Sequence, residues 1–280
     1  MFERVLVPTD LSGYSHAMIG CIGSIPGIEE VALLHVQEPA ESVPGAEAML
    51  LGEMQELQLS GLSVSPILAP PPRDSVADEI LRTAAERKSS LIIIGARGKG
   101  IVEELLLGSV SSSVVRHAPT SVLVMRHRVV ETLEGVRFEK FCPRLFSRVL
   151  VPTDLSGESA GPLTDLLDGI AGIETVILAH VVTRAGAAEL AQASVEDAEL
   201  ALDRLCADLA AEGIRAERRV RAGNPTHEIA RLAEEEDVSL ILVSLHGRNG
   251  LRRAILGSTA YSITEMAARP VLVARQTGWE

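Results

Sequence analysis

The sequence RVLVPTDLSG occupies residues 4–13 and returns letter for letter at residues 148–157. Two later pairs of apolar segments repeat in the same order: VALLHV at 31–36 with VILAHV at 176–181, and VLVMR at 122–126 with VLVAR at 271–275. Segments that recur in order along a chain indicate copies of one structural unit. We therefore predict a first domain over residues 1–128, a linker over residues 129–146 that matches neither copy, and a second domain over residues 147–280.

Each copy alternates short β-branched runs with longer segments of helical periodicity, which predicts crossover connections and a parallel sheet. The first copy places its expected strands near residues 4–8, 31–36, 63–68, 91–95 and 121–125. In the second copy the residues expected to share one helical face before Gly213, a stop signal, are Ala198, Leu202, Leu205 and Leu209. The predicted fold class is α/β, with two five-stranded, Rossmann-like domains in tandem.

Composition narrows the function. A length of 280 residues suits two domains, and a formal net charge of -12 opposes broad binding to nucleic acid or to anionic membranes. The cysteines Cys21, Cys142 and Cys206 fit neither a disulfide framework nor a zinc cluster, which indicates a reducing compartment. Neither a secretory signal nor a membrane span is recognisable, so we expect a cytoplasmic protein.

A glycine-rich loop follows the fourth expected strand of each copy. It is GARGKGIVEELLLGS at residues 95–109 and SLHGRNGLRRAILGS at residues 244–258. We expect a helix to begin at the Gly-Ser pair that closes each loop, because serine can cap the free amides of a first helical turn. Pro119 and Pro270 are expected to end these helices before the last strand.

The ends of strands one and four are the candidate ligand site. Asp10 and Asp154 close the first strand of the two copies, and Gly95 and Ser244 close the fourth. A parallel sheet binds ligands beyond the carboxyl ends of its strands, where the strand order reverses. If strands one and four are neighbours there, these residues rim one cleft, and the following helix would direct its positive end toward a phosphate. Ordinary turns and helix caps remain open as simpler roles for these glycines and aspartates.

These motifs resemble the universal stress protein family in its tandem two-domain form. The family's nucleotide signature is Gly, two residues, Gly, nine residues, then Gly followed by Ser or Thr, and residues 95–109 meet it in full. The second copy has Ser244 in place of the first glycine, although it keeps a Gly-x-Pro element at 223–225 where the first copy has Asp74 and Val76. The resemblance implies a sheet of the adenine nucleotide alpha hydrolase-like type, in strand order 3-2-1-4-5, that binds ATP or AMP, with Mg²⁺ left open.

By the same resemblance, Asp10 would contact the adenosine part and residues 95–98 and 108–109 the ribose and phosphates. A side chain at Ser244 would crowd the ligand and, at a positive φ, add strain of about 1 kcal/mol, so the first copy is expected to be the tighter site. The full set of expected nucleotide-binding residues is Pro8, Thr9, Asp10, Gly95, Arg97, Gly98, Gly108, Ser109, Val110, Pro152, Thr153, Asp154, Ser244, Gly247, Gly257 and Ser258.

Several enzyme classes are disfavoured. Lys99 is followed by Gly100 where a P-loop needs Ser or Thr, and the first turn, PTDLSG, lacks the G-x-G-x-x-G of a nicotinamide dehydrogenase. No nucleophile stands out beside a base, and His35 and His180 are expected to be packed or hydrogen-bonded rather than metal ligands. We expect a nucleotide-dependent regulatory or stress-response protein without a catalytic centre. A scaffold or small-ligand module without nucleotide and a slow ATP hydrolase remain the alternatives.

The last strand of each copy bears on assembly. In the implied order the fifth strand lies at an edge, edges invite pairing, and two such edges meet in dimers of the resembled family. The two halves are therefore expected to form an intramolecular pseudo-dimer. We expect the protein to bind an adenine nucleotide and to bind neither nucleic acid nor membranes. Whether the chain forms a homodimer, and which protein it binds, are left open.

Overall fold

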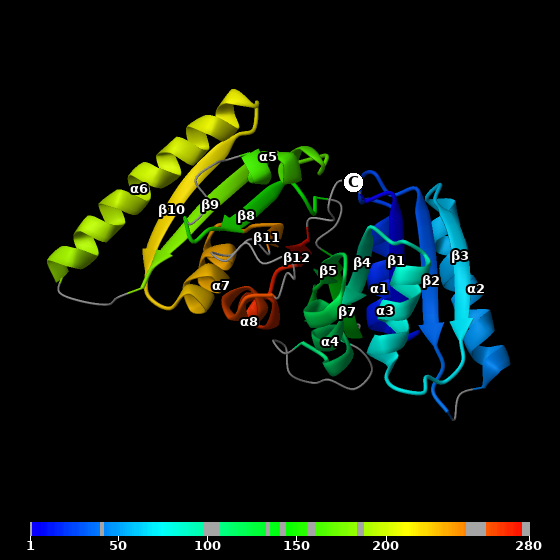
Figure 1. The fold of residues 1–280 in the computed structure, drawn as a ribbon. Helices are drawn as coiled ribbons and strands as arrows, with labels where there is room; N and C mark the ends of the chain where they lie inside the picture. The colour runs from blue at the N-terminus through cyan, green and yellow to red at the C-terminus, as the bar shows by residue number, and fades with distance from the viewer. Residues whose placement is uncertain are drawn as a thin grey trace. The chain divides into compact units, whose positions relative to one another are not determined.

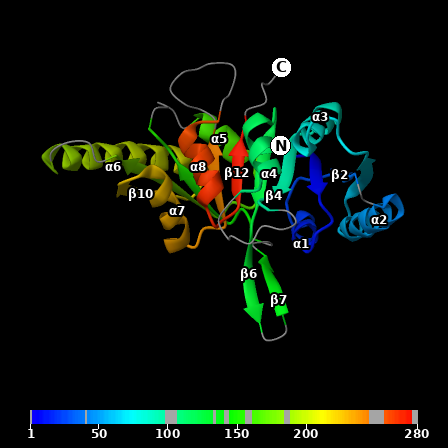
Figure 2. The same ribbon diagram turned by 90° about the horizontal axis from the view of Figure 1, so that it is seen from below.

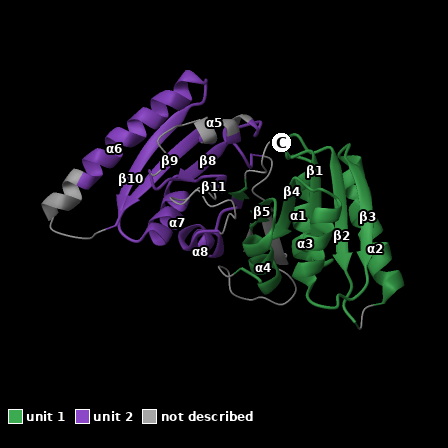
Figure 3. Ribbon diagram, in the orientation of Figure 1, with its two compact units in different colours: residues 1–143, 273–280 green, residues 144–272 purple. Residues whose placement is uncertain are grey.

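The computed structural model describes residues 2–39, 42–97, 107–132, 135–140, 144–155, 161–183, 188–244 and 256–275. The chain divides into two compact units (Figure 3). Unit 1 comprises residues 1–143 and 273–280, and unit 2 comprises residues 144–272.

The strands of unit 1 form a parallel sheet in the order β3-β2-β1-β4-β5 (Figure 1). Their bounds are β1 (Arg4–Thr9), β2 (Glu30–Val36), β3 (Ser63–Ala69), β4 (Leu91–Gly95) and β5 (Ser121–Met125). Leu6 at the centre of β1 lies opposite Ala32 of β2 and Ile92 of β4. The expected strands and the expected neighbours, strands one and four, are therefore confirmed in this unit.

The helices of unit 1 cover both faces of this sheet. Helices α1 (Gly13–Ile22) and α2 (Val43–Leu59) contact each other, as do α3 (Val76–Glu86) and α4 (Ser109–His117). Figure 2 shows the two pairs on opposite sides of the strands. Leu6, Ile92 and Val122 are fully buried between the two layers, which explains why the central strands are continuous apolar runs.

The outer strand β3 is more exposed and carries a proline. The amide of Ser63 donates to the carbonyl oxygen of Glu29 at 3.0 Å, so alternate amides of β3 face β2. Pro66 is three residues further on, and its nitrogen therefore lies on the outer side, where no sheet hydrogen bond is lost. A proline in this position protects an open sheet edge from pairing.

Unit 2 repeats the same strand order as β10-β9-β8-β11-β12. Its strands are β8 (Arg148–Pro152), β9 (Thr175–Val182), β10 (Ala216–Ala222), β11 (Leu240–Ser244) and β12 (Val271–Ala274), of which residues 273–274 fall within the bounds of unit 1. Its helices are α5 (Gly161–Asp168), α6 (Ala188–Ala211), α7 (Pro225–Glu235) and α8 (Ser258–Met266). Leu202 and Leu209 of α6 are buried, and Gly213 follows with a φ of 83°, which confirms the predicted helical face and stop.

Two expectations about the connections need revision. Part of the segment expected to be a linker forms an antiparallel hairpin, β6 (His127–Thr132) and β7 (Gly135–Lys140), which lies beside α1 (Figure 2). Pro270 does not end α8, because that helix stops at Met266. Pro119 directly follows Ala118, the C-terminal cap of α4, as expected.

One of the two described cysteines differs from the expected reduced state. Cys21 is disulfide-bonded, which the wide cysteine spacing did not indicate. Cys206 is a free thiol, and burial raises its pKa above the ordinary value. Across the described ranges of the chain, no helix is long and apolar enough to cross a membrane.

The junction of α1 with α2 offers a test of the packing. A Cβ atom on Gly23 would lie 2.5 Å from the Cβ of Ser60, whereas one on Gly52, within α2, would meet nothing. Gly23→Ala should therefore destabilise the protein by about 1–3 kcal/mol through overpacking. Gly52→Ala should stabilise it by about 0.5–1 kcal/mol, because alanine loses less entropy in a helix. Urea unfolding of both variants measures these changes, and a neutral Gly23→Ala would contradict the close approach of the two helix ends.

Candidate functional site

The turn after β1 is organised by Asp10. Pro8 and Thr9 end the strand, and Oδ1 of Asp10 then accepts hydrogen bonds from the amide of Ser12 at 3.0 Å and from its hydroxyl at 2.5 Å. The hydroxyl of Ser15 donates to the same oxygen at 2.6 Å. Ser12 is the N-terminal cap of α1, so Asp10 joins the end of β1 to the start of that helix. The simpler role considered for this aspartate, holding a turn, is present in the structure.

The same turn has an uncommon backbone conformation in both units. Leu11 has a φ of 58° and Leu155 a φ of 57°, in the left-handed region that side chains disfavour. Their amides each donate at 3.1 Å to the preceding threonine hydroxyl, on Thr9 and Thr153 respectively. Such conformations persist where the surroundings determine them, and they occur most often at functional sites.

A histidine supports each turn from the neighbouring strand. Nδ1 of His35 donates to the carbonyl oxygen of Thr9 at 2.9 Å, and Nδ1 of His180 donates to that of Thr153 at 2.8 Å. The expectation that these histidines are hydrogen-bonded is confirmed. Their pairing holds the end of the first strand against the second in each unit.

The ends of the glycine-rich loop of unit 1 are held together at the end of β4. The amide of Ala96 donates to the carbonyl oxygen of Met125 at 2.9 Å, and the amide of Gly108 donates to that of Ala96 at 2.8 Å. The hydroxyl of Ser111 donates to the carbonyl oxygen of Gly95 at 2.7 Å. These bonds place the end of β4 beside the first turn of α4.

The amino end of α4 differs in detail from the expectation. Gly108, rather than Ser109, is the N-terminal cap, and no side chain caps the helix. Ser109 is the first helical residue and is exposed, and Val110 follows it half-buried. Amides at an uncapped helix start, together with the helix dipole, favour an anion.

Gly95 lies where a side chain would be a tight fit. A Cβ atom at this position would lie 3.1 Å from the carbonyl oxygen of Arg97, closer than an ordinary contact. The φ of Gly95 lies outside the left-handed region, so the strain argument that ranked Ser244 lower does not apply to Gly95. A side chain at this position would instead crowd the backbone of the loop itself, at the carbonyl oxygen of Arg97.

Arg97 connects the loop to α1. Its Nη1 donates to the hydroxyl of Tyr14 at 3.5 Å, and its guanidinium carbon lies 5.9 Å from the centre of that ring. This distance is within the range of a cation–π interaction. Tyr14 was not among the residues predicted from sequence, although its position in the first turn of α1, directly after the Asp10 turn, was the signal available.

The equivalent edge of unit 2 has the same strand arrangement. Leu150 of β8 pairs with Ile241 of β11, so the strand order reverses beside β8 as it does beside β1. Pro152 ends β8, the amide of Thr153 donates to Ala179 at 2.8 Å, and Asp154 is exposed. Of the other residues predicted for this edge, Ser244 ends β11, and Gly257 and Ser258 start α8 without a side-chain cap. The predicted residue Gly247 of this unit and its counterpart Gly98 of unit 1 lie outside the described residues.

A buried carboxyl group lies behind the β1 turn of unit 1. Glu53 of α2 is 6% exposed, hydrogen-bonds to the side chain of Thr9, and has no partner for Oε2. Burial raises the pKa of this carboxyl, and the Thr9 hydrogen bond and the charges of nearby histidines oppose that rise. Glu53 lies on the buried helical stripe of Leu50 and Leu57, which was the signal that sequence reasoning missed.

The second copy has no carboxyl at the corresponding position. Glu53 lies eight residues before Gly61, which follows α2, and Leu205 lies eight residues before Gly213, which follows α6. Leu205 therefore stands at the position of Glu53. An acidic side chain has therefore replaced, or been replaced by, an apolar one at the same place in the fold. The buried acid is a property of unit 1 only.

Glu53 should make stability depend on pH. An acid whose pKa is raised by folding stabilises the protein at low pH, and this contribution is lost as the pH rises above the ordinary value of 4.5 and through the folded-state pKa. Glu53→Gln should therefore have a higher melting temperature than the parent at neutral pH, with the difference shrinking toward pH 4.5. Glu47→Gln, an exposed change on the same helix, is the control. A Glu53→Gln difference that is constant with pH would contradict the burial of a charged group.

A family model described as the universal stress protein family matches residues 73–126 and 145–275, together more than half of the chain. Universal stress protein YxiE of Bacillus subtilis is 39% identical over 66 residues, 24% of this chain and 45% of that protein. A universal stress protein of Mycolicibacterium smegmatis is 26% identical over 211 residues, 72% of this chain and 67% of that protein. One of Mycobacterium tuberculosis is 28% identical over 205 residues, covering 68% of this chain and 63% of that protein. The matched regions thus span about half to two thirds of these relatives.

Solved structures agree on the fold. A universal stress protein from Archaeoglobus fulgidus is similar with a TM-score of 0.63 and 24% identity, covering 97% of this chain and 96% of its own. A second structure, from Pseudomonas aeruginosa, has a TM-score of 0.68 and 21% identity, covering 98% and 93%. With the family model matching both copies, the chain belongs to the universal stress protein family.

Proposed function

We propose that unit 1 binds an adenine nucleotide, ATP or AMP, at the carboxyl edge of its sheet, and that the protein acts as a nucleotide-dependent regulator. The observation that carries this proposal is the gathering of Gly95, Gly108 and Ser109 beside the Asp10 turn. These residues are distant in sequence and belong to the nucleotide signature of the family.

The phosphates are assigned to the start of α4. Its first amides have no side-chain cap, and Ser109 is exposed at the first helical position. Arg97 adds a positive charge from the same loop, and its contact with Tyr14 limits where the guanidinium can lie. The Asp10 turn is the proposed contact for the adenosine part. Whether Mg²⁺ accompanies ATP is a direct outcome of titrations with and without the ion.

Regulation rather than turnover is proposed for this site. The hydroxyl of Ser113 lies 3.4 Å from Nδ1 of His117, but this exposed pair is near the carboxyl end of α4, away from the helix start to which the phosphates are assigned. A nucleotide can favour one conformation only to the extent that it binds the two states differently. The alternative of a scaffold that binds no nucleotide differs in one respect: added nucleotide would then leave thermal stability unchanged. A slow hydrolase would differ by nucleotide turnover that disappears in variants of the site.

Unit 2 is proposed as the weaker site. It shares the turn, the strand order and the uncapped helix start, but Ser244 stands where unit 1 has Gly95, at which a Cβ atom would lie 3.1 Å from the carbonyl oxygen of Arg97. Affinity changes about tenfold for each 1.4 kcal/mol, so a small displacement of this loop is enough to separate the two sites.

Ser109→Asp tests the phosphate position without weakening the fold. A carboxylate at the first turn of α4 should repel phosphate, yet it should stabilise the helix through its dipole by about 0.3–1 kcal/mol. We expect ATP affinity, measured by calorimetric titration, to fall at least tenfold while the melting temperature without nucleotide is maintained.

Ser258→Asp is the matched control, because Ser258 has the same position in α8 of unit 2. It should leave the tighter binding event unchanged. Equal affinity in the parent and Ser109→Asp would contradict the assignment of the phosphates to α4, and loss only in Ser258→Asp would move the site to unit 2.

A further inference from the structure

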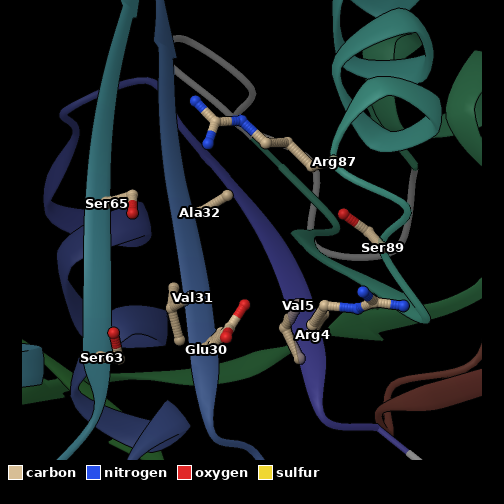
Figure 4. Close-up of a pocket in the computed structure, with 9 residues that line it drawn as sticks. All are labelled: Arg4, Val5, Glu30, Val31, Ala32, Ser63, Ser65, Arg87 and Ser89. Atoms are coloured by element: carbon tan, nitrogen blue, oxygen red, sulfur yellow. The ribbon is translucent and has the colours of Figure 1, made fainter.

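Unit 1 carries a polar groove across the amino-terminal parts of β1, β2 and β3, away from the strand ends at which the nucleotide is proposed. Its volume is about 220 Å³, below the roughly 300–1,000 Å³ typical of pockets for drug-sized ligands. Arg4 and Glu30 lie at the starts of β1 and β2, and Arg87 follows α3. Figure 4 shows the Arg87 side chain reaching from α3 toward β2 and β3. A site of this size suits a small ligand.

The lining is cationic and rich in hydroxyl groups. Ser63, Ser65 and Ser89 contribute hydroxyls, and Glu30 is the one carboxylate among the nine lining residues (Figure 4). Within the described part of the chain, the guanidinium groups of Arg4 and Arg87 take part in no ion pair and no hydrogen bond. Both arginines line the groove in a protein whose net charge is -12, and Figure 4 shows their side chains extending in different directions from different parts of the lining.

The other copy has different residues at the corresponding positions. Arg4 corresponds to Arg148 in the repeated segment that begins each copy. Arg87 lies three residues before the Ser-Leu pair at 90–91, where β4 begins, and Glu236 lies three residues before the same pair at 239–240, where β11 begins. Arg87 therefore corresponds to Glu236. In unit 1, Ser65 of β3 lies opposite Ala32 of β2, which lies opposite Leu6 of β1. In unit 2, Glu217 of β10 lies opposite Ile177 of β9, which lies opposite Leu150 of β8. Leu6 and Leu150 are equivalent in the repeated segment. Ser65 therefore corresponds to Glu217.

In unit 2 these positions form an ion-pair network. Arg148 lies 2.5 Å from Glu236 and 3.8 Å from Glu217, and Arg219 lies 2.5 Å and 3.0 Å from the same two carboxylates. Hydrogen bonds from Arg219 lower the pKa of Glu236, which keeps it charged. At the corresponding positions unit 1 has Arg87 and Ser65 in place of the two carboxylates and Ile67 in place of Arg219, so Arg4 and Arg87 lack the carboxylates that balance the arginines of unit 2.

We propose that the groove of unit 1 is a binding site for a small phosphate-containing anion, held by Arg87 and Arg4. The ligand supplies the negative charge that Glu236 and Glu217 supply in unit 2. Guanidinium groups bind phosphate through paired N–H donors, and the serine hydroxyls can donate to its remaining oxygens. A phosphate group offers more acceptor oxygens than a carboxylate, which matches this set of donors. The site is separate from the proposed nucleotide site and does not depend on it.

The test is a titration of the full chain with pyrophosphate at constant ionic strength, followed by NMR at the amides of Ala32, Ser65 and Ser89. Saturable shifts at these amides are expected, also in Ser109→Asp, in which the proposed nucleotide site is blocked. Separate titrations with inorganic phosphate and O-phosphoserine distinguish free phosphates from phosphate esters as the source. Constant ionic strength is needed because salt screens exposed charges.

Arg87→Glu introduces a carboxylate at the position of Glu236 in unit 2, and this carboxylate can pair with Arg4 as Glu236 pairs with Arg148. We expect at least tenfold weaker pyrophosphate binding without loss of folding. Arg144→Glu makes the same charge change at a residue that is 78% exposed and lies 3.9 Å from its partner Glu174, and it should bind as the parent does.

The double variant Arg4→Gln, Arg87→Gln removes both charges and provides a second test if Arg87→Glu perturbs the fold. Shifts that do not saturate, that persist in Arg87→Glu or in the double variant, or that appear only around Ser109 would overturn the proposal.

Discussion

The parallel pairing of β1 between β2 and β4 is the constraint on which unit 1 depends. Because Leu6 is opposite Ala32 on one side and Ile92 on the other, the strand order reverses beside β1. Neighbouring parallel strands end at the same edge, so the Asp10 turn and the loop after Gly95 must lie together there. The crossover helices that such pairing requires then bring the start of α4 to this edge as well. The candidate site follows from this arrangement rather than from any single residue.

The two copies share the features that this arrangement needs and differ elsewhere. The left-handed leucines, the supporting histidines and the uncapped helix starts occur in both. Glu53 and Arg87 differ from Leu205 and Glu236, and neither change alters the sheet. A duplicated domain can thus keep its framework while one copy acquires a buried acid and an open cationic groove.

Much of the framework could be predicted from the sequence, because strand period, helix periodicity and the repeated segments are local signals. The hairpin of β6 and β7 was not predicted, since its charged residues and its glycine resembled a connecting segment. Glu53 was missed because its burial depends on α2 packing behind Thr9, and Tyr14 because its contact with Arg97 joins elements far apart in the chain. The groove depends on the sheet register, which aligns the first residues of β1, β2 and β3, and on the packing of α3 against β1 and β2, which adds Arg87 to the lining.

The central claim is that unit 1 holds an adenine nucleotide at the edge formed by β1 and β4. The most direct measurement is to denature freshly purified protein and to identify and count the nucleotide that is released. The account predicts ATP or AMP at about one per chain, or, from an initially empty protein, a higher melting temperature on adding either nucleotide. A protein that releases no nucleotide and is not stabilised by millimolar ATP or AMP would contradict it and favour the scaffold.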